Sequence, residues 1–121
     1  MKLTLQTNKS DVFIKNYENH KIYINDKVFE NNIMIINSNI TKWEMTSLKI
    51  STHEYYEEIL MAKPEIIIIG TGAKLIMPDN KLIHEIHKKN IGIEFMITES
   101  ACKTYNVLAS ENRNIAAGLL L

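Results

Sequence analysis

Short apolar runs separated by asparagine and aspartate dominate residues 13–43. Three of these runs are rich in the β-branched and aromatic residues that favour strands, at 21–24, 27–30 and 33–36. The dipeptides between them, Asn25-Asp26 and Asn31-Asn32, suit tight reversals because Asn and Asp tolerate positive φ. The pattern predicts a β-meander, then a loop at 37–39 and an edge segment at 40–43.

A helix is predicted next, over about residues 52–63. Ser51-Thr52-His53-Glu54 matches the capping box, in which the Ser hydroxyl and the Glu carboxylate accept hydrogen bonds from free backbone N–H groups. Apolar residues then recur at the spacing of one helical face, and Pro64 ends the run.

The second half of the chain alternates between strands and helices. Residues 66–69 are four isoleucines, apolar on both faces, as in a central strand covered by helices on each side. A helix should open at Pro78-Asp79 and close near Asn90, before a strand at 91–97. A strand, helix and strand in this order predict two parallel strands joined by a right-handed crossover. A third helix at 100–112 and a final strand at 115–121 complete an α/β protein.

Composition limits the function classes. With 121 residues, 45% hydrophobic, we expect one globular domain over 1–121. Fourteen basic residues balance fourteen acidic ones, which disfavours nucleic acid as a partner. The single cysteine, Cys102, excludes an intramolecular disulfide, and no apolar run has the length of a signal peptide core or of a transmembrane segment. We therefore expect a cytoplasmic protein without a membrane span.

The glycine turn Gly70-Thr71-Gly72 is the first candidate for chemistry. It follows the isoleucine strand at its carboxyl end, the edge of an α/β sheet where ligands bind. A dinucleotide fingerprint would need a third glycine where Leu75 stands, and no P-loop lysine follows. The turn is therefore either a ligand-binding loop or a plain end to the strand.

Cys102 is the second candidate, because we expect it in the first turn of the third helix. Free N–H groups and the helix dipole lower the pKa of a thiol there. No histidine is placed near it by local spacing, so a small side chain that packs the helix end is the alternative to a nucleophile.

The remaining candidates are histidines and aromatic residues. His84 and His87 share a helix, but the segment lacks the His-Glu-x-x-His spacing of a zinc protease, and a solvated face is the simpler interpretation. Trp43 and Tyr105 could line a pocket or pack in the core. We expect no metal and no cofactor.

Residues 92–108, with the segment 111–117, resemble the Mth-type domain family, which includes the mitochondrial respiratory complex I assembly factor three and its adipogenesis-associated relative. Thr104-Tyr105-Asn106 is the most specific part of this match. Pro64-Glu65, the isoleucine run, the glycine turn and Pro78 follow the order of the family's second motif. The segment 21–25, Val28-Phe29 and Trp43 look like its first. The resemblance covers about residues 17–121, and the lack of a mitochondrial presequence before Met1 is typical of a bacterial member or of a mature chain.

The resemblance implies a three-layer fold around a mixed sheet of about five strands, with helices on both faces and a β-rich N-terminal part. It also implies a non-catalytic interaction or assembly factor related to respiratory complex I assembly. Such a factor would bind a protein partner, such as membrane or respiratory complex subunits, and could form a homo-oligomer.

The alternative is a small-ligand-binding protein or an enzyme. The glycine turn and the start of the third helix lie at the carboxyl ends of successive parallel strands, so a cleft can form between them. The candidate ligand-binding residues of this cleft are Gly70, Thr71, Gly72, Cys102, Thr104, Tyr105 and Asn106.

Overall fold

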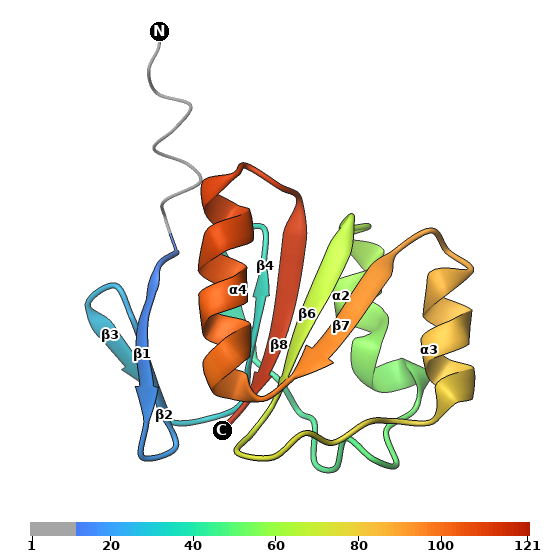
Figure 1. Ribbon diagram of the computed structural model, residues 1–121, viewed down its shortest axis with the longest axis horizontal. Coiled ribbons are helices and arrows are strands. Elements are labelled where there is room, and N and C mark those ends of the chain that lie inside the picture. The colour runs from blue at the N-terminus through green and yellow to red at the C-terminus, as the bar shows by residue number, and fades with distance from the viewer. Residues whose placement is uncertain (1–11) are drawn as a thin grey trace, which may run out of the picture.

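The computed structural model describes residues 12–121, which form two sheets and four helical segments (Figure 1). The small antiparallel sheet has the order β1-β2-β3 and comprises Ile14–Glu18, Lys21–Ile24 and Lys27–Phe29. The large sheet has the order β5-β4-β8-β6-β7 and comprises Asn39–Lys42, Ile33–Ile36, Ile115–Leu120, Ile66–Thr71 and Gly92–Met96. The helical segments are the 3₁₀ helix η1 (His53–Tyr56) and the α-helices α2 (Glu57–Met61), α3 (Asn80–His87) and α4 (Thr98–Ser110).

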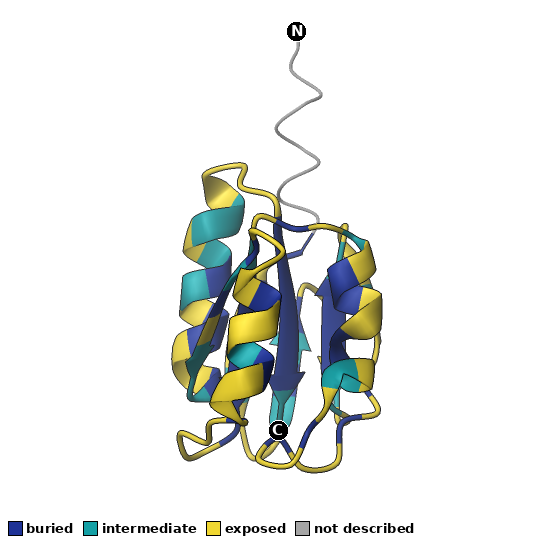
Figure 2. Cartoon of the chain, turned by 90° about the vertical axis from the view of Figure 1, so that its right-hand side faces the viewer, coloured by how far each residue is buried: buried dark blue, intermediate teal, exposed yellow. Residues whose placement is uncertain are grey.

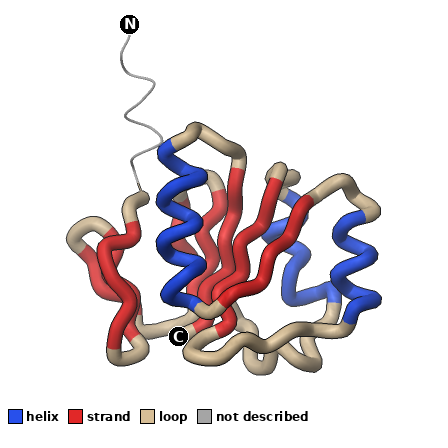
Figure 3. The backbone as a smooth tube through the Cα atoms, in the orientation of Figure 1, coloured by secondary structure: helices blue, strands red, loops and turns tan. Residues whose placement is uncertain are grey.

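The large sheet is mixed, as predicted for an α/β protein. Strand β6 runs parallel to β7 and to β8, while β4 runs antiparallel to β8 and to β5. Helix α3 connects β6 to β7, and these two strands pair in parallel, which confirms the predicted strand–helix–strand unit. Figure 3 shows the two sheets and the helices around them.

Strand β6 lies inside the sheet because both of its faces are apolar. Ile67 and Ile69 pack into one core cluster with residues of α2 and α3, whereas Ile68 packs into a second cluster with residues of α4 and the small sheet. All three isoleucines are fully buried. The sheet is thus covered on both faces, and Figure 2 shows its buried strands between helices whose outer faces are exposed.

The predicted β-meander is wrong at one point, because β3 and β4 belong to different sheets. Strand β4 is buried along most of its length and pairs with β8 and β5, whereas β3 is largely exposed and pairs with β2. The Asn32 side chain does not close a hairpin. It donates to the Met45 carbonyl at 3.2 Å and accepts from the Leu121 N–H at 2.9 Å. The sequence pattern also did not separate β1 as a strand of its own.

The capping box predicted at Ser51 does not form. The Ser51 hydroxyl donates to the Leu48 carbonyl at 2.6 Å and lies 2.8 Å from the Tyr56 hydroxyl, and Thr52 bonds the Glu54 side chain. The first helix therefore begins as 3₁₀ at residue 53 and ends as α-helix at residue 61, inside the predicted 52–63.

The boundaries of the other strands agree with the pattern to within two residues, and the final strand begins at the predicted residue. Helix α3 ends at His87, three residues before the predicted close near Asn90. Asp79 caps α3 by accepting from the Lys81 N–H at 3.0 Å, and Asn90 adopts the predicted left-handed conformation after it, with φ of 63°. Helix α4 spans 98–110 in place of the predicted 100–112. Within residues 12–121, no helix has both the length and the apolar character needed to cross a membrane.

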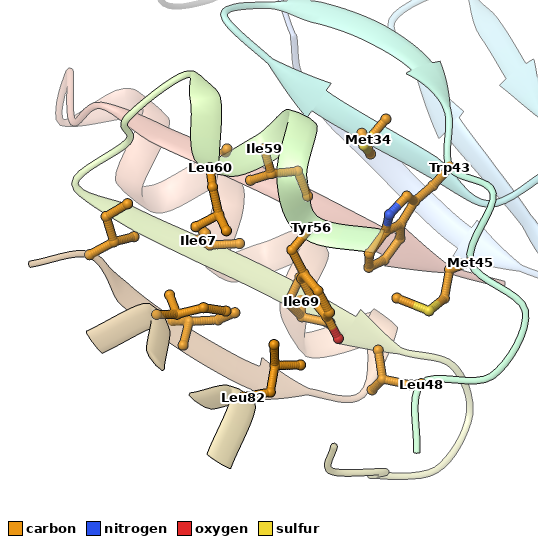
Figure 4. Packing of buried hydrophobic residues seen from close by; sticks show 14 residues of the cluster. Met34, Trp43, Met45, Leu48, Tyr56, Ile59, Leu60, Ile67, Ile69 and Leu82 are labelled. Carbon is orange, nitrogen blue, oxygen red and sulfur yellow. The ribbon is translucent and has the colours of Figure 1, made fainter. Parts of the chain in front are cut away.

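Trp43 and Tyr56 anchor the long connection between β5 and β6 (Figure 4). Their rings meet edge to face with centroids 5.9 Å apart, and the Trp43 Nε1–H donates to the Tyr55 carbonyl at 2.8 Å. The Trp43 ring also lies against Gly118 in β8. Trp43 and Tyr105 are both buried core residues, which is the second of the two roles considered for them.

Candidate functional site

The glycine turn and the start of α4 lie side by side at the carboxyl end of β6. The Gly72 N–H donates to Thr98 Oγ1 at 2.8 Å, and the Thr98 N–H donates back to the Gly72 carbonyl at 2.9 Å. A Cβ atom added to Gly70 would lie 2.8 Å from the same Oγ1. Gly72 has a φ of 96°, which favours glycine. The two segments are therefore in direct contact.

Thr98 is the residue at this junction that the sequence did not single out. Its side chain is fully buried, and its hydroxyl also donates to the Leu120 carbonyl at 2.6 Å, so it joins the ends of β6 and β8 to α4. A strand predicted to end at Ile97 and a helix predicted to start at Ser100 left Thr98 in the connection between them. The signal that could have found it is a threonine directly after an apolar strand, a common place for a helix to begin.

Thr71 organises the loop that follows β6. Its hydroxyl donates to the Lys74 carbonyl at 2.5 Å and accepts from the Ile76 N–H at 3.3 Å, and the residue is buried. The same loop exposes three consecutive apolar side chains, with 59% of Leu75, 38% of Ile76 and 46% of Met77 accessible. Thr71 thus shapes an exposed apolar loop.

Cys102 lies two residues further into α4 than expected, because the helix begins at Thr98 and not at Ser100. Its side chain packs in the cluster that includes Ala101 and Tyr105. Burial, with a smaller effect of the Glu99 carboxylate, raises the pKa of the Cys102 thiol to about 12. The helix dipole therefore does not activate this thiol, which stays protonated at neutral pH.

Alkylation of Cys102 by iodoacetamide at pH 7.5 is expected to be slow in the folded protein and fast in urea. The nucleophile is the thiolate, which both burial and the raised pKa suppress. Mass spectrometry over time gives both rates, with free glutathione as the unhindered reference. A folded-state rate equal to that of glutathione would contradict the packing role.

The three other candidates on α4 have separate surroundings. The Thr104 hydroxyl lies 3.4 Å from the Met96 sulfur, and burial raises the pKa of Tyr105 to about 12. The Asn106 carboxamide accepts from the Ile14 N–H at 3.0 Å and donates to the Ile14 carbonyl at 2.8 Å. Asn106 therefore fastens β1 to α4.

His84 and His87 are exposed on α3. Among residues 12–121, no three His, Cys, Asp or Glu side chains gather closely enough to hold a metal ion.

A groove that the sequence did not indicate lies between α2 and the turn that joins α3 to β7. It has a volume of about 630 Å³. Its lining combines apolar and charged side chains, namely His53, Glu57, Leu60, Met61, Lys63, Pro64, Lys89, Asn90 and Ile91.

The described residues thus define an α/β domain in which the polar groups at the end of β6 bond one another, beside an exposed apolar loop. The chain belongs to the family described as protein of unknown function (DUF498/DUF598), whose model matches residues 14–120. This finding confirms that the chain has the type of domain that its sequence resembles.

The chain is similar in sequence to two named proteins over most of its length. The "13 kDa major membrane protein" of Francisella tularensis subsp. holarctica (strain LVS) is 31% identical over 118 residues, which cover 94% of this chain and 96% of that protein. The "NADH dehydrogenase [ubiquinone] 1 alpha subcomplex assembly factor 3" of Xenopus tropicalis is 30% identical over 90% of this chain, and the match spans 61% of the factor's length.

Solved structures agree with the fold. An outer membrane protein from Bartonella henselae superposes with a TM-score of 0.79 at 31% identity, over 90% of this chain and 93% of that one. A Bordetella pertussis protein described as a Mth938-like domain superposes with a TM-score of 0.74 at 20% identity, over 99% and 92% of the two chains. The second likeness shows the Mth-type fold.

Proposed function

We propose that this protein is a non-catalytic interaction factor that binds a protein partner during the assembly of membrane or respiratory complexes. Homology to the assembly factor of NADH dehydrogenase supports the class of function. The observation that carries the proposal is the apolar loop after β6, which we define as Leu75, Ile76 and Met77. Contiguous exposed apolar side chains are typical of protein-binding surfaces.

The apolar loop is held in place before any partner binds. Two hydrogen bonds of the Thr71 hydroxyl, to the Lys74 carbonyl and from the Ile76 N–H, fix the backbone on both sides of Leu75. A loop ordered in advance loses less conformational entropy on binding, which favours affinity. The connection between β5 and η1 lies at the same end of the molecule as the apolar loop (Figure 1). It carries Ile50, which is 75% exposed, and a partner that reaches both segments would bury more apolar surface.

The small-ligand alternative is less well supported, because both contacts of the Thr71 hydroxyl are to its own loop and Thr98 occupies the space beside Gly70. In this proposal, the role of the glycine turn is to hold the binding loop in position. Gly70, Thr71 and Gly72 do not contact a ligand themselves. A cytoplasmic location and self-association stay part of the proposal.

Site-specific photo-crosslinking in the native cell tests this function. With benzoylphenylalanine in place of Leu75, we expect cross-links to identified subunits or assembly intermediates of a membrane-bound complex. Val107 on α4 is the matched control, because it is 56% exposed and lies outside the apolar loop. The proposal fails if position 75 gives no protein cross-link, or gives only the products obtained at position 107.

A further inference from the structure

The groove between α2 and the α3–β7 turn has an apolar floor. Leu60 and Ile91 are buried at 8% and 7% exposure beside the buried Pro64, and Met61 stands at the rim with 75% of its surface exposed. The volume of about 630 Å³ is within the range of sites that take compact ligands or side chains. A flexible, polarisable methionine at the rim suits contact with apolar side chains of varied shape.

Two lysines give the groove its polarity. Lys63 and Lys89 both line it, and neither forms an ion pair with another of the residues 12–121. The carboxylate that lines the groove, Glu57, stands at the first residue of α2, whereas Lys63 follows the end of that helix. Glu57 and Lys63 therefore line the groove from opposite ends of α2, and Lys89 lines it from the α3–β7 turn.

Backbone hydrogen bonds hold the two segments that carry Lys63 and Lys89 in fixed positions. The Lys63 N–H donates to the Leu60 carbonyl at 3.0 Å, and the Lys89 N–H donates to the Ile86 carbonyl at 3.0 Å. A hydrogen bond from the Gly92 N–H to the Glu65 carbonyl, at 3.1 Å, ties the segment after Lys63 to the segment after Lys89. The distance between the two lysine positions is thus set by the fold before binding.

We infer that this groove binds an acidic amphipathic segment of the partner protein, with apolar side chains on Leu60 and Ile91 and carboxylates beside Lys63 and Lys89. The inference rests on the proposed function and names the partner's chemistry. Apolar contact supplies most of the affinity, because ion pairs that stay exposed to water contribute little to binding. The lysines supply selectivity and fix the direction of the bound segment.

Two fluorescent synthetic peptides test the inference with the full chain. Both form a leucine-faced helix, and one carries three glutamates at the end where the other carries three lysines. Fluorescence anisotropy should show that the acidic peptide binds about tenfold more tightly, since two rim charge pairs together reach that ratio.

Charge reversal should invert this preference. The double variant Lys63→Glu/Lys89→Glu should bind the basic peptide more tightly than the acidic one. The matched control Lys15→Glu/Lys103→Glu changes the same total charge at exposed sites on β1 and α4 and should keep the original preference. Failure of both peptides to bind, equal binding of both, or an unchanged preference in the Lys63/Lys89 variant would each overturn the inference.

Benzoylphenylalanine at Met61 separates this inference from the proposed function. Sequencing of the cross-linked peptide should give an acidic segment of the partner that is captured at Leu75. Cross-links at position 75 with none at 61, or with a basic segment at 61, refute the groove and leave the proposed function standing. Absence of partner cross-links at both positions refutes both.

Discussion

Replacing Gly118 by alanine is expected to lower the free energy of unfolding by about 3 kcal/mol, at the upper end of overpacking effects. A Cβ atom at this position would lie 2.6 Å from Cζ3 and 2.8 Å from Cη2 of Trp43. The indole cannot easily move aside, because its Nε1–H is bonded to Tyr55 and its ring is packed against Tyr56. The clash therefore displaces either β8 or the connection that carries Trp43.

Gly92 provides the matched control, since it also lies in a strand of the large sheet. A Cβ atom there would come no closer than 3.5 Å to Ile66, an ordinary contact. Gly92→Ala should change stability by less than about 1 kcal/mol. Urea denaturation followed by the fluorescence of Trp43, the chain's one tryptophan, measures both variants. Equal losses in the two variants would show that the Trp43 contact is not the cause.

The second half of the fold was predictable because its signals are local and agree with one another. Four successive isoleucines at 66–69 predict a strand that is buried on both faces, because successive side chains of a strand point to opposite faces. The structure confirms this prediction. Asp79 marks the start of α3 because its side chain caps the helix, and Asn90 marks the end because asparagine adopts a positive φ more readily than most residues. Each of these positions fixes its structure without knowledge of distant contacts.

The sequence predictions were wrong where the polar side chain of a local motif could form its hydrogen bonds either locally or with distant residues. Asn31-Asn32 has the composition of a hairpin turn, yet Asn32 bonds Met45 and Leu121, so the chain passes from one sheet to the other. Ser51 has the composition of a helix cap, yet its hydroxyl bonds Leu48 and Tyr56. Tertiary hydrogen bonds decided both cases, and the sequence pattern does not report them.

The candidate site was predictable in its position and not in its chemistry. Parallel strand order placed Gly72 near the start of α4, where the structure has it. Which polar side chains would be free depended on contacts that the sequence does not show. The Thr71 hydroxyl bonds its own loop, the Asn106 carboxamide bonds Ile14, and the fully buried Thr98 forms the junction. Polar residues near a sheet edge therefore indicate a site only when their hydrogen-bonding capacity is not already used.

Replacing Thr98 by valine is expected to lower the free energy of unfolding by about 3 kcal/mol. Valine keeps the shape but removes an acceptor from the Gly72 N–H and a donor to the Leu120 carbonyl, and each buried group left unpaired costs about 1–3 kcal/mol. Thr98→Ser retains both bonds and loses one methyl group, so it should cost only about 1 kcal/mol.

Urea denaturation gives the two free energies, and amide hydrogen exchange shows where the loss arises. In Thr98→Val the Gly72 amide should exchange faster than in Thr98→Ser, because its bond to Oγ1 at 2.8 Å is gone. The Gly92 amide serves as the reference, because it donates to the Glu65 carbonyl at the start of β7, whereas Thr98 follows the end of that strand. Its exchange rate should change only with global stability. If valine and serine were equally destabilising and Gly72 kept its protection in both, the hydroxyl would not be what holds β6, β8 and α4 together.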